Sequence, residues 1–564
     1  MTPTTRTNPL LLAVLGALLL SGGWAPWPTA WLVPLLFIGW VPYLLLERQL
    51  TLTGARKGRV FASTYLMLVL WNALTTWWVS YASLAGIAAV TLNAALMCLP
   101  LMAFRQTKKR LGNRWGYLSL PIYWIAFEQL HLHWDITWPW LTLGNGFAAA
   151  PQWVQWYEYT GFLGGSVWVW VVNMLFFGWL VPNAFQELKG ESEELKTAAS
   201  TEPFEFNSAL LTFPLKLLTP LLAILLPIGL SYLIGSTYHE KGPTAEVVVV
   251  QPNLDPYVEK FEGGPKFVPY DEQLTRLLTL SVQHLTPSTS LVLWPETALE
   301  EAMWESTIES NPKIRRIREW LRQHPGVALL TGITTINSYP SKEAASETAR
   351  YRDDLGYYDF NNAAGYFASA NAPLAIYHKS RLVPGTEKIP PVLSNVLKSI
   401  DLGGFVGSYG SQPERTVFVA PTSAPALRVA PVICYESIYG DFIGEYMANG
   451  ATLLGLVTND AWWHDSPGYR QLLSYGQLRC IETRRDLARA ANTGFTGFIN
   501  QKGEIIQREK AWIPTASRAT VHLNDEVTFY SRFGELIGRG AQGLAVLMLL
   551  AAIVTGFSRK VSQG

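Results

Sequence analysis

The chain has 564 residues and a formal net charge of +1, so it is too long for one ordinary domain and carries no overall charge that would attract nucleic acid. Hydrophobic residues make up 49% of it and charged residues only 15%, against about 25% charged residues in a typical soluble domain. Because tryptophan favours membrane interfaces and the chain has 23 tryptophans, the composition predicts one membrane-embedded part and one soluble part.

Apolar segments of membrane-spanning length dominate the first 240 residues, and one more lies near the C-terminus. A helix that crosses a bilayer needs roughly 17–25 residues. In chain order the segments cover about 9–24, 27–46, 60–80, 86–104, 117–133, 164–183, 209–236 and 541–558. The first segment also fits a cleaved signal peptide, because Arg6 precedes a short leucine-rich stretch, but the spans that follow favour an uncleaved helix. We therefore predict a bundle of about eight helices, seven of them in residues 1–240.

The distribution of basic residues orients this bundle. The loops after the second and fourth segments contain Arg48, Arg56, Lys57, Arg59, Arg105, Lys108, Lys109, Arg110 and Arg114. The loops after the first and third segments contain no lysine or arginine. Since cytoplasmic loops are enriched in these residues, the N-terminus is predicted to be cytoplasmic and the region after residue 240 to lie outside.

Residues 244–525 change to the pattern of a soluble α/β domain. Short apolar, β-rich runs end in polar residues or turns, as expected for strands that are buried on both faces. The runs cover 245–253, 289–296, 326–337, 427–436 and 451–460. Helical patterns cover 271–285, 311–324 and 469–490. The alternation of strands and helices predicts a sheet covered by helices, with functional residues where the strands end.

Residues that can carry chemistry follow three of the predicted strands. Glu296 follows "LVLWP", Cys434 follows "APVI", and Asn459 with Asp460 follows "LGLVT". A fourth candidate, Lys379, lies in "LAIYHKSRLVPGTEKIP". A cysteine nucleophile needs activation by a base or by a nearby positive charge, so a glutamate, a lysine and a cysteine make a plausible catalytic triad.

Each of these three residues also has an ordinary structural interpretation. Cys434 could be a small buried hydrophobe, although the polar "CYES" directly after the strand argues against a core position. Glu296 could be a solvated loop carboxylate, or Trp294 and Pro295 could desolvate it and raise its pKa toward that of a general base. Lys379 could be a surface lysine, but its apolar neighbours disfavour a fully exposed position.

The remaining polar residues and cysteines fit structural roles more readily. Glu387 and Glu436 are either surface charges or groups that hold the lysine or line a pocket. Four residues fit a structured turn better than a catalytic role: Asn459, Asp460, Trp462 and Trp463. Cys480 lies on a predicted helix and fits packing, and Cys98 lies in a predicted membrane span. The three cysteines have neither zinc-type spacing nor the pattern of a disulfide framework.

Several motifs together resemble one known superfamily. In chain order they are "LWPETA", "YHKSRLVPGTEKIP", "ICYES" and "TNDAWW", which resemble the motifs of the nitrilase (carbon-nitrogen hydrolase) superfamily. With the membrane segments around them and "WPWLTLGN" near residue 140, nearly the whole chain is similar to the apolipoprotein N-acyltransferase family. The resemblance implies an αββα sandwich joined to a transmembrane bundle, with Glu296 as base, Lys379 as oxyanion stabiliser and Cys434 as nucleophile. Three further residues match supporting positions of the pocket: Glu387, Tyr435 and Glu436.

One motif of the chain departs from the family pattern. The family commonly reads "HLVPFGE" where this chain reads "RLVPGTE", so Arg381 replaces a histidine and no aromatic residue precedes Gly385.

Residues 253–265 follow the first predicted strand and include Tyr257 and Phe261. We predict that they form a mobile aromatic lid, because a reactive acyl intermediate has to be shielded from water.

The resemblance also implies a reaction and its setting. An acyl chain would pass from a phospholipid, through a cysteine thioester, to the N-terminal amine of a diacylated apolipoprotein, without a metal or cofactor. The implied setting is a monomer in the bacterial inner membrane, with domain 244–525 periplasmic and the helix 541–558 returning the chain to the cytoplasm; no nucleic acid takes part. Two other classes stay open: a membrane-tethered amidase or nitrilase acting on a small substrate, and a transporter or receptor with an external α/β binding domain.

Overall fold

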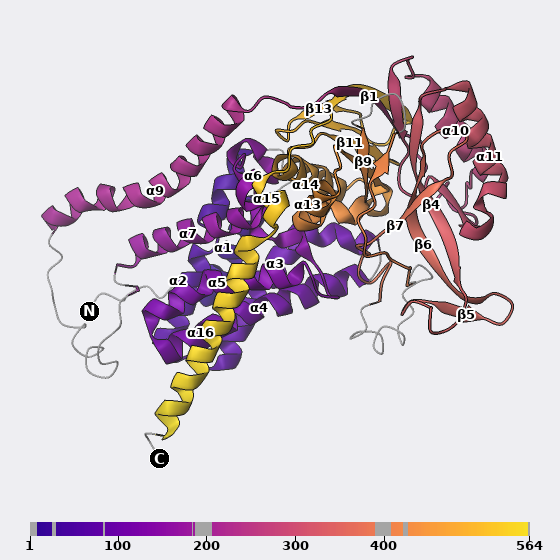
Figure 1. The fold of residues 1–564 in the computed structure, drawn as a ribbon. Coiled ribbons are helices and arrows are strands. Elements are labelled where there is room, and N and C mark those ends of the chain that lie inside the picture. The colour runs from indigo at the N-terminus through magenta and orange to yellow at the C-terminus, as the bar shows by residue number, and fades with distance from the viewer. Residues whose placement is uncertain are drawn as a thin grey trace.

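The computed structural model describes residues 8–24, 30–82, 85–182, 184–185, 206–389, 408–420 and 427–561. Figure 1 shows a helical bundle in indigo and violet and an α/β domain against one end of it. The first seven residues lie outside the described ranges, and with them Arg6 of the alternative signal-peptide interpretation.

Helices form at all eight predicted apolar segments. They are α1 (Pro9–Gly22), α2 (Val41–Leu52), α3 (Lys57–Thr76), α4 (Ala85–Leu111), α5 (Asn113–His131), α7 (Leu163–Leu180), α9 (Phe206–Thr237) and α16 (Leu536–Val561). A 3₁₀ helix, Ala30–Phe37, precedes α2. Within the described ranges, six spans are long and apolar enough to cross a membrane; α1, with 14 residues, and α5 are not among them. Helix α16 begins at Leu536, before the predicted start at residue 541.

Two helices, α9 and α16, expose most of their apolar side chains. In their most apolar stretches only 11% and 22% of the residues, respectively, are buried. Figure 1 shows α9 standing apart from the other helices and α16 running along the bundle. Long apolar faces of this kind are unfavourable in water and suit lipid. The centre of the bundle, by contrast, holds four stacked or edge-packed tryptophans: Trp40, Trp71, Trp124 and Trp170.

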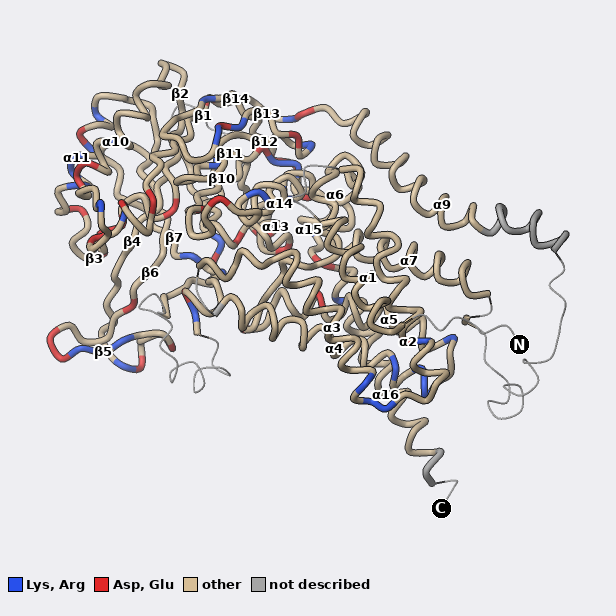
Figure 2. Tube along the Cα trace, turned by 180° about the vertical axis from the view of Figure 1, so that it is seen from behind, with Lys and Arg blue, Asp and Glu red and all other residues tan. Residues whose placement is uncertain are grey.

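Lysine and arginine residues gather at the end of the bundle that lies away from the α/β domain (Figure 2). There Arg105 and Lys108 of α4 both contact Glu47 of α2, with N–O distances of 3.2 and 2.6 Å. The Glu47 side chain is buried, so its two cationic partners offset the loss of its hydration.

The α/β domain contains two sheets. The strands of the first are β1 (Thr244–Gln251), β2 (Thr289–Leu293), β3 (Leu299–Trp304), β4 (Ala328–Tyr339), β5 (Arg350–Arg352), β6 (Gly356–Phe367), β7 (Ala375–His378) and β14 (Thr515–His522). Their order is β14-β1-β2-β4-β6-β5, with β3 beside β4 and β7 beside β6. The strands of the second sheet are β8 (Phe418–Val419), β9 (Arg428–Ile433), β10 (Leu453–Thr458), β11 (Leu487–Ala491), β12 (Gly497–Ile499) and β13 (Ile505–Arg508). They lie side by side in the order in which they occur along the chain. Strands β1, β2 and β4 run parallel, as do β9, β10 and β11.

The sheets face each other, and helices cover their outer faces. Alternate residues of β1 point to opposite sides, so Val247 and Val249 join the core between the sheets, while Val248 and Val250 join a second core. The second core lies under α10 (Tyr270–Val282) and α11 (Pro312–Gln323). Helices α13 (Gly440–Ala448) and α14 (Pro467–Thr483) pack on the other sheet. The layers are therefore α, β, β and α, as the resemblance implies.

One predicted element is wrong in part. The helix predicted over 469–490 ends at Thr483, and its last residues form β11. Arg484 takes a left-handed conformation with φ of 50°, which ends the helix. Residues from Leu487 then pair with β10 in parallel register. Sheet pairing in the core thus overrides the helical preference of this alanine- and arginine-rich segment.

Helix α14 joins the domain to the bundle. The Tyr475 hydroxyl donates to the Trp140 carbonyl over 2.9 Å, and Gln471 Nε2 donates to the Thr75 carbonyl over 3.0 Å. The indole nitrogen of Trp24 in turn donates to the Tyr475 hydroxyl. Trp140 belongs to the "WPWLTLGN" motif, so this motif positions the domain on the membrane part.

Candidate active site

Two of the three predicted catalytic side chains are in direct contact. Glu296 follows β2 and Lys379 follows β7, and both belong to the first sheet. Lys379 Nζ lies 3.0 Å from Glu296 Oε1, and both side chains are almost completely buried. The chain turns sharply after the glutamate, where Thr297 has a φ of 51°. Gly332 of β4 supports this turn, because a Cβ there would come within 2.5 Å of the Glu296 Cα.

A second carboxylate and an amide complete the cluster. Lys379 Nζ also donates to Glu387 Oε1 over 2.9 Å. Asn362 Nδ2 donates to Oε1 of both Glu296 and Glu387, over 2.7 Å in each case. The other oxygen of Glu387 accepts from the Val383 backbone N–H over 2.8 Å. The altered "RLVPGTE" segment therefore still places its glutamate against the lysine.

Cys434 lies directly after β9 and turns off the strand. Its φ is 48°, a left-handed conformation that costs of order 1–3 kcal/mol for a residue other than glycine. The thiol interacts electrostatically with Glu296 and Lys379, and the side chain of Thr458, at the end of β10, hydrogen-bonds it. Only 6% of the residue is exposed. All three predicted side chains therefore meet where strands of the two sheets end.

The charges of this cluster follow from burial and pairing. Burial, followed by the nearby Glu296 charge, raises the pKa of the Cys434 thiol. Burial alone would also raise the pKa of Glu296, but the Lys379 charge and the hydrogen bonds to its carboxylate outweigh this effect and lower the pKa. Burial disfavours the Lys379 cation, yet the two glutamates hold its pKa well above the usual value. The resting site thus holds a thiol, a carboxylate and an ammonium. The expectation of a raised Glu296 pKa is therefore wrong, because the Lys379 charge and the hydrogen bonds to the carboxylate outweigh the effect of desolvation.

Glu436 connects the lysine segment to the cysteine strand. Its Oε1 accepts from the Tyr377 hydroxyl and the Ser380 N–H, each over 2.7 Å, and from the Arg381 N–H over 3.2 Å. Its Oε2 accepts from the Ile433 N–H over 2.8 Å. The side chain is fully buried, so it fixes the spacing between the segment that carries Lys379 and the one that carries Cys434 rather than facing solvent.

Tyr435 points toward the membrane part. Its hydroxyl donates to the Thr137 carbonyl over 3.3 Å, and its ring packs edge-on against Tyr439. The Trp140 ring lies 6.3 Å from the Tyr435 ring, centroid to centroid. The residue after the cysteine thus links the site to the segment that follows α5.

The two halves of the chain match two known domains. Residues 16–175 match the apolipoprotein N-acyltransferase N-terminal domain, and residues 267–528 match the carbon-nitrogen hydrolase domain. The chain is 32% identical to the apolipoprotein N-acyltransferase of Chlorobaculum tepidum, over 97% of each chain. The chain belongs to the apolipoprotein N-acyltransferase family.

Other relatives show the same pattern. The apolipoprotein N-acyltransferase of Geobacter metallireducens is 24% identical over 96% of this chain and 95% of that protein. Among solved structures, an amidase from Nesterenkonia sp. is 15% identical, with a TM-score of 0.34 over 54% of this chain and 99% of that chain. The two apolipoprotein N-acyltransferases match this chain over both the bundle and the α/β domain.

In this family member the turn after β10 has both a positioning and a structural part. The Asn459 backbone N–H donates to Glu296 Oε2 over 2.9 Å, so the main chain holds the glutamate from a third side. Asp460 forms a bidentate pair with the buried Arg489, at 3.0 and 2.9 Å. Their side chains stabilise the turn, in agreement with the structural interpretation of this segment.

The predicted lid segment packs on that turn. The Tyr257 hydroxyl donates to the Trp462 carbonyl over 2.9 Å, and the Phe261 ring stacks on the Trp462 ring at 5.5 Å. Between these aromatics, Lys260 is buried and points inward. Its Nζ donates to the Thr297 hydroxyl over 2.6 Å and to the Glu296 carbonyl over 3.3 Å. The segment is therefore anchored to the turn that carries the glutamate.

Sequence reasoning missed two residues of this site, Asn362 and Lys260. Asn362 lies within "DFNNAAGYF", where a polar pair interrupts an otherwise apolar strand, and that interruption was a usable signal. Lys260 lies in a polar loop and had no such signal. Its burial results from contacts with a turn that lies 36 residues further along the chain.

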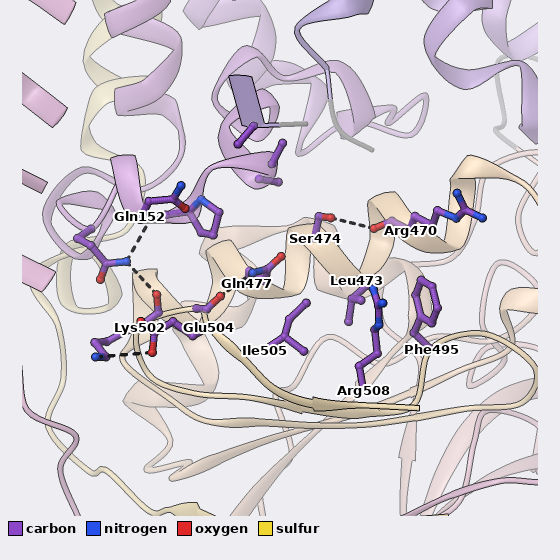
Figure 3. Close-up of a pocket in the computed structure, with 16 residues that line it drawn as sticks. Gln152, Arg470, Leu473, Ser474, Gln477, Phe495, Lys502, Glu504, Ile505 and Arg508 are labelled. Atoms are coloured by element: carbon purple, nitrogen blue, oxygen red, sulfur yellow. Dashed lines mark hydrogen bonds and ion pairs between the residues drawn. The ribbon is translucent and has the colours of Figure 1, made fainter. Parts of the chain in front are cut away.

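A separate cleft of about 690 Å³ lies between the bundle and the α/β domain (Figure 3). Its lining includes Gln152, Arg470, Ser474, Gln477, Lys502 and Arg508. None of Glu296, Lys379 and Cys434 lines it. The cleft borders α14 and the turn between β12 and β13, so it is distinct from the cluster described above.

Proposed function

We propose that this chain transfers an acyl chain from a membrane phospholipid, through a thioester on Cys434, to the N-terminal amine of a diacylglyceryl-cysteine apolipoprotein. Membership of the apolipoprotein N-acyltransferase family supports the acceptor and the membrane setting. The observation that carries the chemistry is the buried cluster in which Lys379 bridges Glu296 and Glu387 beside the cysteine. This arrangement supplies a base, a fixed positive charge and a nucleophile within one water-poor site.

In the first half of the reaction the thiol attacks the acyl ester of the phospholipid. Glu296 is ionised and takes the thiol proton while Sγ bonds to the carbonyl carbon. The Lys379 ammonium stabilises the negative oxygen that forms. The ester C–O bond then breaks, and Glu296 returns the proton to the alkoxide of the leaving lysophospholipid. A neutral thioester on Cys434 remains.

In the second half the amine of the apolipoprotein attacks the thioester. Glu296 accepts a proton from the attacking nitrogen as the C–N bond forms, and it returns this proton to the thiolate as the C–S bond breaks. The products are an amide and the free thiol. Glu387 and Asn362 hold the lysine and the base in place through both halves, because each bonds directly to one or both of them.

The membrane arrangement fits this reaction. We place the N-terminus in the cytoplasm, the bundle in residues 1–240, the catalytic domain 244–525 in the periplasm and the helix 541–558 as the return span of a bacterial inner-membrane monomer. Two observations support this orientation. The basic residues gather at the bundle end opposite the domain, as cytoplasmic ends do (Figure 2). The catalytic cluster lies at the other end, where Tyr435 contacts the segment after α5.

The thioester has to be shielded from water between the two half-reactions. The aromatic segment 253–265 is the proposed lid. It packs on the turn after β10 through Tyr257 and Phe261, and Lys260 ties it to the base segment.

The test is to incubate the purified protein with phospholipid labelled in its acyl chain and to measure hydroxylamine-sensitive label on the protein. Cys434→Ala should abolish this label, and Glu296→Gln should slow its formation strongly. Cys480→Ala is the matched control, because that thiol is fully buried in α14. If Cys434→Ala still forms the labelled protein, the nucleophile assignment fails. Release of free fatty acid or ammonia in place of a triacylated product would indicate a hydrolase.

A further inference from the structure

Arg381 is held beside the catalytic cluster by its main chain. It lies two residues after Lys379, and its backbone N–H donates to Glu436 Oε1 over 3.2 Å. Its guanidinium lies over two aromatic rings, with the central carbon 5.3 Å from the centroid of Tyr439 and 5.7 Å from that of Phe442. The side chain is half-buried, so it is fixed in place but still accessible from one side.

The Arg381 guanidinium has no anionic partner within the described part of the chain. No described carboxylate lies within 4.0 Å of it, and its Nε is buried without a hydrogen-bond acceptor. Arg415 offers a direct comparison, because its guanidinium lies 3.8 Å from the centroid of the same Phe442 ring. The Nε of Arg415 also makes no hydrogen bond, but it lies 3.1 Å from Glu445 Oε2 in an ion pair. Two arginines thus share one ring, and only one of them has a carboxylate.

The surroundings of Arg381 meet the end of the bundle. The Tyr439 hydroxyl lies 2.7 Å from the Thr137 hydroxyl, and Asp441 Oδ2 lies 2.8 Å from His133 Nε2. Both bundle residues belong to the segment after α5. Asp441 is the acid that faces the guanidinium, and it is already engaged by the histidine. Among the described residues, Arg381 therefore has no directly bonded carboxylate where the reacting centre meets the membrane part, and Asp441 acts on it only at longer range.

A half-buried guanidinium without a partner is costly, because its hydration is lost and no charge replaces it. Its planar set of N–H donors matches the oxygens of a phosphate, which can accept two parallel hydrogen bonds. A phospholipid carries its phosphate on the same glycerol as the ester that the thiol attacks. An ester placed at Cys434 thus brings the phosphate within a few bonds of the reacting atoms, on the side that faces the membrane.

We propose that Arg381 binds the phosphodiester of the phospholipid acyl donor. The inference rests on the proposed function and deepens it by assigning the group that recognises the donor. The acceptor, a diacylglyceryl-cysteine, carries no phosphate. Arg381 therefore serves acylation of the enzyme and has no part in transfer from the enzyme.

The test separates the two half-reactions and uses the full-length protein. Acylation of Arg381→Met is followed with labelled phosphatidylglycerol and with a p-nitrophenyl ester of the same fatty acid, an activated donor that has no phosphate. With the phospholipid, acylation should slow by about tenfold or more, as expected for a lost hydrogen bond to a charged group. With the nitrophenyl ester it should match the unmodified protein. Transfer from the preformed acyl-enzyme to a diacylglyceryl peptide should also be unchanged.

Three further arms make the outcome decisive. Arg381→Lys should recover part of the rate with phospholipid, because it restores the charge without the planar donors. Arg415→Met, the matched control, should leave unchanged the ratio of the acylation rate with phospholipid to the acylation rate with the nitrophenyl ester. Phosphatidylcholine should show the same loss as phosphatidylglycerol if the phosphate, and not the head group, is bound. Equal slowing with both donors, or no slowing with phospholipid, would overturn the inference. A failure of the proposed function would give a different result, because Cys434→Ala would then still become acylated by the phospholipid.

Discussion

Asn362 is one of two site residues that the quoted motifs do not contain, and its replacement gives the sharpest test of what sets the pKa of the proposed base, Glu296. Its single amide nitrogen donates to Oε1 of Glu296 and of Glu387, over 2.7 Å each. Asn362→Leu keeps the approximate size of the side chain and removes both bonds. Glu296 then keeps Lys379 and the Asn459 N–H as partners, but it loses one donor that favours its ionised form.

The size and sign of the effect follow from these contacts. A hydrogen bond to a charged group contributes about 1.5–3 kcal/mol. One pKa unit corresponds to about 1.4 kcal/mol, so losing the bond should raise the pKa of Glu296 by about 1–2 units. In its proposed role as base, Glu296 must be ionised, and its partners in the unmodified protein lower its pKa. The acid limb of the acylation rate should therefore move by about 1–2 pH units toward higher pH.

The measurement is the rate of thioester formation from labelled phospholipid across an acidic to neutral pH series. Asn361→Leu is the matched control. It is the neighbouring residue on β6 and is also buried, and its amide donates to Asn337 Oδ1 over 2.7 Å instead of to Glu296 and Glu387. An acid limb that stays in place in Asn362→Leu, or one that moves equally in both variants, would refute the reasoning.

Two other predictions concern groups that hold the site together. Glu436→Gln should lower the free energy of unfolding by about 1–3 kcal/mol, because an amide N–H₂ would face the buried Ile433 N–H. Thermal denaturation measures this loss, and the exposed Glu414→Gln is the control. Lys260→Met should slow thioester formation by about tenfold, because the turn at the catalytic glutamate loses both of its bonds from the lid segment. The exposed Lys266→Met, directly after the lid segment, should leave that rate unchanged, and equal slowing in both variants would contradict an anchoring role for Lys260.

Much of the fold could be read from local patterns. All eight predicted apolar segments are helical, and the five predicted apolar runs correspond to β1, β2, β4, β9 and β10. These elements are recognisable because burial on both faces, or in lipid, requires an apolar run of fixed length. The end of the helix predicted over 469–490 was wrong, because pairing with β10 decides the conformation of Leu487 to Ala491 and no local signal reports that pairing.

The sequence by itself determined the residue types of the candidate site. Lys379 and Cys434 stand directly after a strand and Glu296 shortly after one, and all three lie within motifs that could be quoted from the chain. Only the tertiary structure decided how these groups are charged. The Glu296 pKa depends on Lys379, Asn362 and the Asn459 backbone, which come from strands and turns far apart in the chain.

The tertiary structure also decided which cations are compensated. Lysine and arginine are equally visible in the sequence wherever they occur, but their partners are not. Lys379 has two carboxylates and Arg415 has one, whereas Arg381 has none within the described residues. The physical reason is that electrostatic pairing acts over a few ångströms in space, and the packing of two sheets against a membrane bundle sets those distances.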